Sequence, residues 1–274
     1  MTMRVGEIPG RLENAPHQGA CWSADSVRFL LDLPAIGRFL AADGCCVTIQ
    51  PAPGVAIEDI LIFATGTAMA AILYQRGAML LHGSAVTHQG RTFIFCGPSG
   101  VGKSTLAAAL CRSGCGFISD DVCAISHLAD GTPIIEPDGR VLRLYPDSIG
   151  QVGMEDAVGS RVRQMLEKFH VTPPEHDTPK KEAPPLAAIY LLADSNPVDL
   201  PGIVRLAPLE AAQALLRQSY RRRIALAYAH QGQPAARTAA LLSRVGVYRL
   251  SRPREFAQLD ETVARLRTHW DQLA

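Results

Sequence analysis

The segment Gly97–Ser104 has the residue types and the spacing of a phosphate-binding loop. It reads Gly-Pro-Ser-Gly-Val-Gly-Lys-Ser and fits the pattern G-x-x-x-x-G-K-[ST] in full. Glycines let the backbone close around phosphate oxygens, so that successive amide hydrogens point inward. In this pattern Lys103 neutralises the β- and γ-phosphates, and the Ser104 hydroxyl ligands Mg²⁺. The sequence therefore predicts nucleotide binding by Gly97, Pro98, Ser99, Gly100, Val101, Gly102, Lys103, Ser104 and Thr105.

Two adjacent carboxylates, Asp120 and Asp121, follow the apolar segment Phe117–Ser119. A loop of this kind needs a carboxylate for the metal. Asp120 lies 17 positions after Lys103 (120 − 103), and a helix of about ten residues rises about 15 Å, so the next strand must return directly to the loop. Neighbouring residues of an extended segment point to opposite sides. One carboxylate would then face the metal and the other the acceptor or a base; the alternative is a surface turn without a role.

A histidine, His82, precedes the predicted hairpin Ser84–Phe95, whose second strand leads into the loop. The hairpin folds His82 back toward the loop side of the sheet. A single histidine is more often structural than catalytic, so a catalytic role for His82 depends on this placement.

The surrounding elements follow from hydrophobic patterning and turn residues. Strands are predicted at Val27–Leu33, Cys45–Gln50, Met79–Leu81, Ser84–His88, Arg91–Cys96, Phe117–Ser119, Val122–Ser126, Pro133–Pro137, Val141–Leu144, Leu186–Leu192 and Val247–Leu250. Helices are predicted at Ile57–Tyr74, Lys103–Arg112, Arg161–Phe169, Leu209–Ala229, Pro234–Val245 and Glu255–Leu273. This order predicts an α/β protein with a small N-terminal α+β region, residues 1–78, followed by a P-loop domain, residues 79–274.

The segment Val171–Pro185 contains five prolines together with Lys180 and Lys181. Loops longer than about 12–15 residues are uncommon in compact domains unless they bind something or are disordered. We expect this one to form part of the acceptor site; the alternative is a surface connection with no role.

The composition limits the classes of protein. The chain has 274 residues, a formal net charge of +1 and 47% hydrophobic residues, which favours a globular protein and argues against one that coats nucleic acid. Three consecutive arginines, Arg221–Arg223, spread around a helix and do not form a one-sided patch. No secretory signal is visible, and the apolar stretches are interrupted or short, so we expect no membrane association and a cytoplasmic location. The seven cysteines form no CxxC pair and are expected to be buried thiols.

Three segments together resemble the HPr kinase/phosphorylase family, in its shorter branch: LLHGSAV, GPSGVGKST and GFISDDV. The resemblance is close over residues 79–150 and weaker beyond. It implies a P-loop fold of the type shared with phosphoenolpyruvate carboxykinase, and the cofactors ATP and Mg²⁺. It also implies that Asp120 acts as base toward a serine hydroxyl with the help of His82. Asp121 and Ser104 would then lie near Mg²⁺.

The sequence departs from the full-length enzymes where they carry the segment E-I-R-G-L-G-I. The comparable place, Ile135–Arg140, has no clear match, so the resemblance does not extend to recognition of HPr or to the reverse phosphorolysis. Short relatives resemble kinases found beside lasso-peptide maturation enzymes, which phosphorylate a serine of a precursor peptide. We therefore expect an ATP- and Mg²⁺-dependent serine kinase acting on a peptide or small protein.

Two other functions remain open from the sequence: a kinase of a free small molecule such as an amino acid, and a nucleotide-binding sensor or scaffold without catalysis. The roles of Arg140 and Arg143 are also open. Full-length relatives form hexamers, so a homo-oligomer is possible, although the short branch need not share that state.

Overall fold

The computed structural model of the chain divides into two compact units. One contains Met1–Leu80 and Ser219–Arg237, and the other contains Leu81–Gln218 and Thr238–Ala274. The structure describes residues 1–139, 141–163, 166–174, 183–193 and 202–273. The sequence placed a single boundary after residue 78 and did not separate 219–237 from the second unit. The hydrophobic pattern of a sequence cannot show that residues 219–237 belong to the first unit, because tertiary contacts decide on which unit a helix packs.

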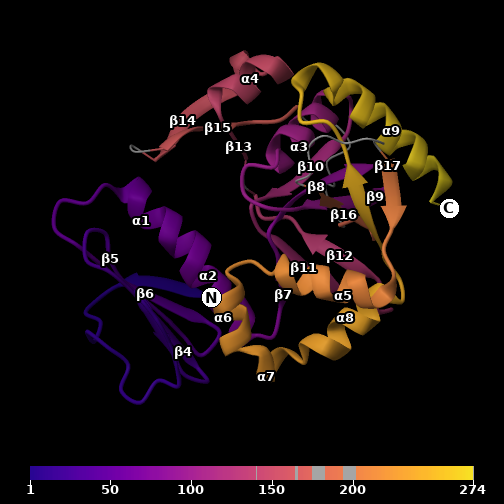
Figure 1. The fold of residues 1–274 in the computed structure, drawn as a ribbon. Helices are drawn as coiled ribbons and strands as arrows, with labels where there is room; N and C mark the ends of the chain where they lie inside the picture. Colours follow the sequence, from indigo (N-terminus) through magenta and orange to yellow (C-terminus); the bar gives the residue numbers. More distant parts are fainter. Residues whose placement is uncertain (140, 164–165, 175–182, 194–201, 274) are drawn as a thin grey trace. The chain divides into compact units, whose positions relative to one another are not determined.

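The first unit is built on a six-stranded sheet with the order β1-β6-β5-β4-β3-β2. Figure 1 labels its strands β4, β5 and β6. Strand β1 is parallel to β6, and the other neighbours are antiparallel. Phe29, Phe39 and Val47 are fully buried in its core. The strands are β1 (Thr2–Val5), β2 (His17–Gly19), β3 (Trp22–Ala24), β4 (Arg28–Leu33), β5 (Gly37–Ala42) and β6 (Cys46–Pro51).

A continuous helical run packs in the same unit and confirms the predicted helix. It consists of α1 (Ile57–Phe63), a π-helical turn (Ala64–Ala68) that contains Gly66, and α2 (Met69–Gln75). By length and composition this run, with a mean hydropathy of 1.5, is the one helix among the described residues that could cross a membrane. Half of it is buried inside the protein, and a core helix passes the same test.

The excursion 219–237 adds short helices to the first unit. They are α6 (Arg222–Ala227) and α7 (Ala229–Gly232), followed by α8 (Pro234–Leu242), which runs on past Arg237. The Tyr228 hydroxyl donates to the carbonyl of Arg28 at 2.8 Å. The single helix predicted over Leu209–Ala229 is wrong, because the helix α5 (Pro208–Arg217) ends before Arg221, which has a left-handed φ of 48°.

The second unit has a six-stranded sheet with the order β10-β8-β9-β16-β18-β17. Its three central strands, β9, β16 and β18, are parallel, and the outer strands are antiparallel to their neighbours. The central strand β16 is almost wholly apolar, as expected for a strand covered on both faces. The strands are β8 (Gly83–His88), β9 (Arg91–Cys96), β10 (Gly116–Asp120), β16 (Leu186–Leu192), β17 (Gly202–Arg205) and β18 (Gly246–Ser251), with β7 (Met79–Leu81) before them.

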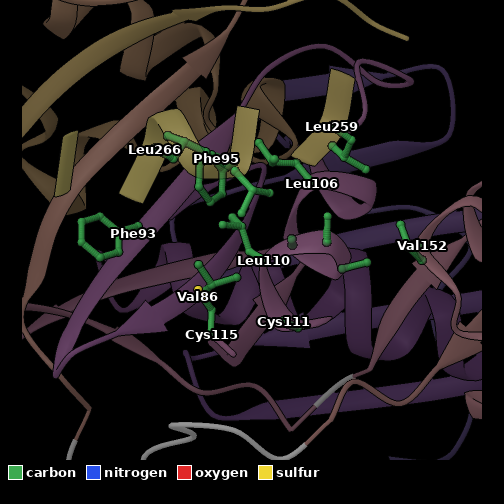
Figure 2. Packing of buried hydrophobic residues seen from close by; sticks show 14 of the residues in the cluster. Val86, Phe93, Phe95, Leu106, Leu110, Cys111, Cys115, Val152, Leu259 and Leu266 are labelled. Carbon is green, nitrogen blue, oxygen red and sulfur yellow. The ribbon is translucent and has the colours of Figure 1, made fainter. Parts of the chain in front are cut away.

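Helices α3 (Lys103–Arg112) and α9 (Leu259–Gln272) pack on this sheet and enclose the main core. Figure 2 shows Leu106 and Leu110 of α3 directed into the same cluster as Phe95 of β9 and Leu266 of α9. A short 3₁₀ turn, Phe256–Gln258, leads into α9. Together these elements make a mixed α/β unit. The packing of α3 in this core fixes the position at which that helix begins.

A hairpin replaces one predicted helix. The segment Arg161–Phe169 forms parts of β14 (Val158–Arg163) and β15 (Leu166–Val171), so its prediction as a helix is wrong. Helical propensity in this segment is overridden by the antiparallel pairing of β14 with β15, and β13 (Leu142–Leu144) pairs in turn with the end of β15, because weak local propensity yields to tertiary contacts. The remaining elements are β11 (Cys123–His127), β12 (Pro133–Glu136), α4 (Pro146–Val152) and a 3₁₀ turn (Glu155–Ala157).

Some expectations fall on residues that the structure does not describe or are only partly met. Arg140 and residues 175–182, which include Lys180 and Lys181, lie outside the described residues. Four of the seven cysteines are buried as expected, whereas Cys21 and Cys45 are exposed and Cys46 is half-buried. All seven are free thiols.

Trp270 of α9 provides a test of the packing in the second unit. Its ring is fully buried and stacks on Phe93 at 4.0 Å between centroids. We expect Trp270→Ala to lower the free energy of unfolding by about 3–5 kcal/mol, because it leaves a large cavity. Leu209→Ala, at a side chain that is 72% exposed, should change it by no more than about 0.5 kcal/mol. Urea unfolding of both variants measures this, and equal small effects would contradict the docking of α9.

Candidate functional site

The predicted strand–loop–helix arrangement is confirmed, with β9 ending at Cys96 and α3 beginning at Lys103. Gly102 occupies the N-cap position of α3 with a left-handed φ of 91°. A Cβ atom added there would lie 2.6 Å from Nη2 of Arg252. The left-handed backbone favours glycine at this position, and a Cβ atom would also force the end of the Arg252 side chain to move.

Lys103 is buried, with 7% of its surface exposed. Its Nζ donates to the carbonyl oxygens of Gly97 and Pro98, both at 2.9 Å. Burial lowers the pKa of Lys103, and the charges of Asp120 and Asp121 partly oppose this shift. A phosphate bound at the loop would favour the charged form for the same reason, because an opposite charge stabilises a buried ammonium.

Asp120 is the most constrained acid of the site, with 2% of its surface exposed. Its Oδ1 accepts hydrogen bonds from the hydroxyls of Ser84 at 2.6 Å and Ser104 at 2.9 Å. Its Oδ2 accepts from the backbone N–H of Arg143 at 3.1 Å. The antiparallel register of β10 and β8 places Ser84 directly opposite Asp120. Three elements, β8, α3 and β13, therefore hold one carboxylate beside the first turn of α3.

Asp121 faces a different set of partners. Its Oδ1 lies 3.2 Å from Nδ1 of His82, and its Oδ2 lies 3.3 Å from Nη1 of Arg143. The same Nδ1 is 2.9 Å from the carbonyl oxygen of Asp121. Since a carbonyl oxygen only accepts, we assign the ring proton to Nδ1, which puts the lone pair of neutral His82 on Nε2. Asp121 and His82 thus form a carboxylate–imidazole pair.

The expected pairing of the two acids is exchanged in the structure. His82 contacts Asp121 instead of Asp120, and Ser104 contacts Asp120 instead of Asp121. Strand β10 has a bulge after Phe117, which shifts the alternation of side chains. Asp121 then leaves the strand with a left-handed φ of 78°. The expected pairing came from the sequence resemblance, whereas regular alternation by itself left open which of the two acids faces the metal.

The other predicted nucleotide-binding residues occupy two environments. Pro98, Ser99 and Gly100 are exposed at the crest of the loop, whereas the side chain of Val101 is buried in the core cluster. The hydroxyl of Thr105 lies 3.0 Å from that of Ser148, and therefore contacts α4. Because the side chains of Val101 and Thr105 contact other parts of the protein, their backbone groups are left to meet a ligand.

Sequence reasoning missed three residues around this site and left a fourth without a role. Ser84 was seen only as part of a hairpin, and Arg143 was noted with no function. Arg252 and Arg254 were not considered, although both donate to carbonyls of the loop. The bond between Arg252 and Gly102 spans 150 positions, and nothing in the local pattern of either segment signals it.

The oxygens of Ser104 and Asp120 fit the preferences of Mg²⁺, which is bound through one or two carboxylates together with substrate phosphates. Within the part of the chain that the structure describes, no group of three or more His, Cys, Asp or Glu side chains could hold a metal by itself. This donor set is therefore suited to a metal shared with a phosphate ligand.

Comparison with solved structures finds distant likenesses, among them an HPr(Ser) kinase. No family model and no curated protein sequence matches the chain. The solved HPr(Ser) kinase/phosphatase from Coxiella burnetii is similar in structure, with 12% sequence identity, a TM-score of 0.37, and coverage of 71% of this chain and 92% of that one. A likeness this distant supports no functional argument, so function must be argued from the site itself.

The hydrogen bond from Ser84 to Asp120 should contribute measurably to stability. We expect Ser84→Ala to lower the free energy of unfolding by about 1.5–3 kcal/mol, because it removes a fully buried donor from a charged acceptor. Ser126→Ala is the matched control, since Ser126 donates to Glu136 at an exposed position. Chemical denaturation measures both variants. Equal costs would show that Asp120 does not depend on Ser84.

Proposed function

We propose that the chain is an ATP- and Mg²⁺-dependent kinase with a P-loop domain, and that it phosphorylates a serine hydroxyl of a peptide or small protein. One observation carries the proposal: the adjacent acids Asp120 and Asp121 form two different pairs beside the same loop. Asp120 pairs with Ser104, and Asp121 pairs with His82. The first pair suits a metal–phosphate ligand and the second suits proton transfer. Phosphoryl transfer to an alcohol needs both.

The phosphate side of the proposed reaction involves the loop backbone and Lys103. Amide hydrogens of the loop and the N-terminus of α3 bind the phosphates of ATP, and Lys103 exchanges its two carbonyl partners for phosphate oxygens. Ser104 and Asp120 would hold Mg²⁺. The bound metal neutralises charge that develops on the phosphate oxygens.

The acceptor side involves the second pair. A bond forms between the serine Oγ and the γ-phosphorus while the bond from that phosphorus to the bridging oxygen breaks, which releases ADP. The hydroxyl proton passes to the Asp121–His82 pair. Arg143 orients Asp121 through its contact with Oδ2. We assign the proton to this pair because the oxygens of Asp120 already accept three hydrogen bonds, which proton uptake would disrupt.

A peptide or small-protein acceptor is the part of the proposal that rests on sequence resemblance. The segments LLHGSAV, GPSGVGKST and GFISDDV are similar to those of serine kinases, and the shorter branch includes kinases of lasso-peptide precursors. The precursor of a ribosomally made natural product is accordingly the first acceptor to test. ATP consumption is measured with a serine-containing peptide, with its Ser→Ala version and with free serine. Turnover with free serine alone would favour a small-molecule kinase. The absence of turnover with every acceptor would favour a nucleotide-binding sensor.

Lys103 should be essential for transfer. We expect Lys103→Ala to reduce phosphoryl transfer to background, because no other side chain on the loop supplies a charge to the γ-phosphate. Lys103 is buried, so Lys103→Met serves as a control that keeps most of the packing while removing the charge. Radiolabel transfer and circular dichroism are measured together. Undiminished transfer by a folded Lys103→Met protein would contradict the assignment of the loop.

The two acids should differ in phenotype. We expect Asp121→Asn to retain ATP binding and lose about 10²–10⁴-fold in kcat, the usual contribution of general-base catalysis. Asp120→Asn should instead raise the Mg²⁺ concentration needed for half-maximal rate. A magnesium titration at saturating ATP separates the two effects. The opposite pattern would restore Asp120 as the base, and no effect in either variant would contradict both roles.

A further inference from the structure

Two arginines hold the phosphate-binding loop from its carbonyl side. They belong to the segment Ser251–Glu255, which reads Ser-Arg-Pro-Arg-Glu and follows strand β18. Nη2 of Arg252 donates to the carbonyl of Val101 at 3.0 Å and, more weakly, to that of Gly102 at 3.5 Å. Nη2 of Arg254 donates to the carbonyl of Gly100 at 2.8 Å. Three consecutive carbonyls therefore point at guanidinium groups.

The position of Arg252 is unusual for a cation. Its side chain is buried, with 6% of the residue exposed. Burial, and to a lesser extent the nearby Arg254, lower the pKa of Arg252. Other arginines of this unit pair with acids, as Arg112 does with Asp260 at 2.7 Å. Among the described residues no carboxylate forms an ion pair with Arg252. Burying a charge without a counter-charge is costly, so we expect the contacts of the buried Arg252 guanidinium with the loop to serve a function.

The geometry of the peptide group links these carbonyls to the ligand side of the loop. The carbonyls of residues 100, 101 and 102 share their peptide groups with the N–H groups of Val101, Gly102 and Lys103. A donor placed on a carbonyl oxygen polarises the peptide and strengthens the attached N–H as a donor. In the loop pattern these amides are the ones that point toward phosphate. Arg252 thus acts on the amides of Gly102 and Lys103, which are expected to bind the ligand. Arg254 acts on the amide of Val101, which in the structure donates to the carbonyl of Pro98 at 3.4 Å.

We propose that Arg252 and Arg254 are positioning residues that lock the loop in its phosphate-binding conformation and strengthen its amides toward the polyphosphate of a nucleotide. This proposal rests on the proposed function and specifies how that site binds its anionic ligand. The buried Arg252 supplies the fixed contact, and its fit against Gly102 leaves no room for a Cβ atom. The exposed Arg254 supplies the contact at the crest of the loop.

The experiment compares the binding of pyrophosphate and ADP to the full chain and to three variants, Arg252→Gln, Arg252→Lys and Arg254→Gln. Titration calorimetry gives the affinities, and hydrogen exchange of loop peptides in the ligand-free protein gives the protection of residues 100–103. Arg265→Gln is the matched control, because Arg265 pairs with Glu261 on α9, away from the loop. Circular dichroism checks the fold of each variant.

We expect Arg252→Gln to weaken binding of both ligands about tenfold or more, and to speed exchange of the loop amides. Arg252→Lys should recover part of the affinity because it keeps the charge and one donor. In steady-state assays Arg252→Gln should raise the KM for ATP and leave the KM for the acceptor unchanged. Should Arg252→Gln fail to fold, Arg252→Lys and the exposed Arg254→Gln give the same readouts with smaller shifts.

Several results would overturn the proposed role of Arg252 and Arg254 as positioning residues of the loop. Unchanged affinities in all Arg252 and Arg254 variants would overturn this role. If Lys103→Met had nevertheless lost transfer, the proposal that the chain is a kinase would still stand. Faster exchange with unchanged affinity would reduce both arginines to structural residues and overturn it as well. A wild-type chain that binds neither pyrophosphate nor ADP would overturn both the role of the two arginines and the proposed function.

Discussion

Asp120 is the carboxylate on which the arrangement of the site depends. Its oxygens accept from Ser84 on β8, from Ser104 on α3 and from the backbone of Arg143 on β13. These elements are far apart in the chain, and a buried charge satisfied by three donors ties them together. The tie also orients what comes next: Arg143 reaches on to Asp121, whose other oxygen faces His82. The metal-binding and proton-accepting functions proposed for the site are therefore mechanically linked.

Charge explains why an anionic ligand suits this place. Two buried cations contact carbonyl oxygens of the loop, which are only partial negative charges: Lys103 at its end, and Arg252 from the segment after β18. Lys103 contacts the first carbonyls of the loop, and Arg252 contacts the last ones. The positive end of α3 lies between these contacts and adds to the positive charge of the loop. This local charge favours an anionic ligand, such as the phosphates of the proposed reaction.

The sequence predicted the features that local chemistry controls. The eight-residue loop, the strand before it and the helix after it follow from glycine conformations, Lys103 and a short apolar strand, and the structure confirms their order. The helix predicted over Ile57–Tyr74 is confirmed by a helical run that ends at Gln75. The strands β14 and β15 were mispredicted as a helix over Arg161–Phe169, since residues of helical propensity become extended there through strand pairing. Local preference of a few tenths of a kcal/mol per residue loses to such contacts.

By itself the sequence predicted a loop of the phosphate-binding pattern between a strand and a helix, with two acids and a histidine near it. Tertiary structure alone decided how they pair. The bulge in β10 and the left-handed turn at Asp121 assign Ser104 to the first acid and His82 to the second, and regular alternation gives no sign of either. Likewise, Arg252 meets the loop only because parallel β18 ends beside β16, which lies next to β9. Contacts across 150 positions are set by sheet order, which no local pattern encodes.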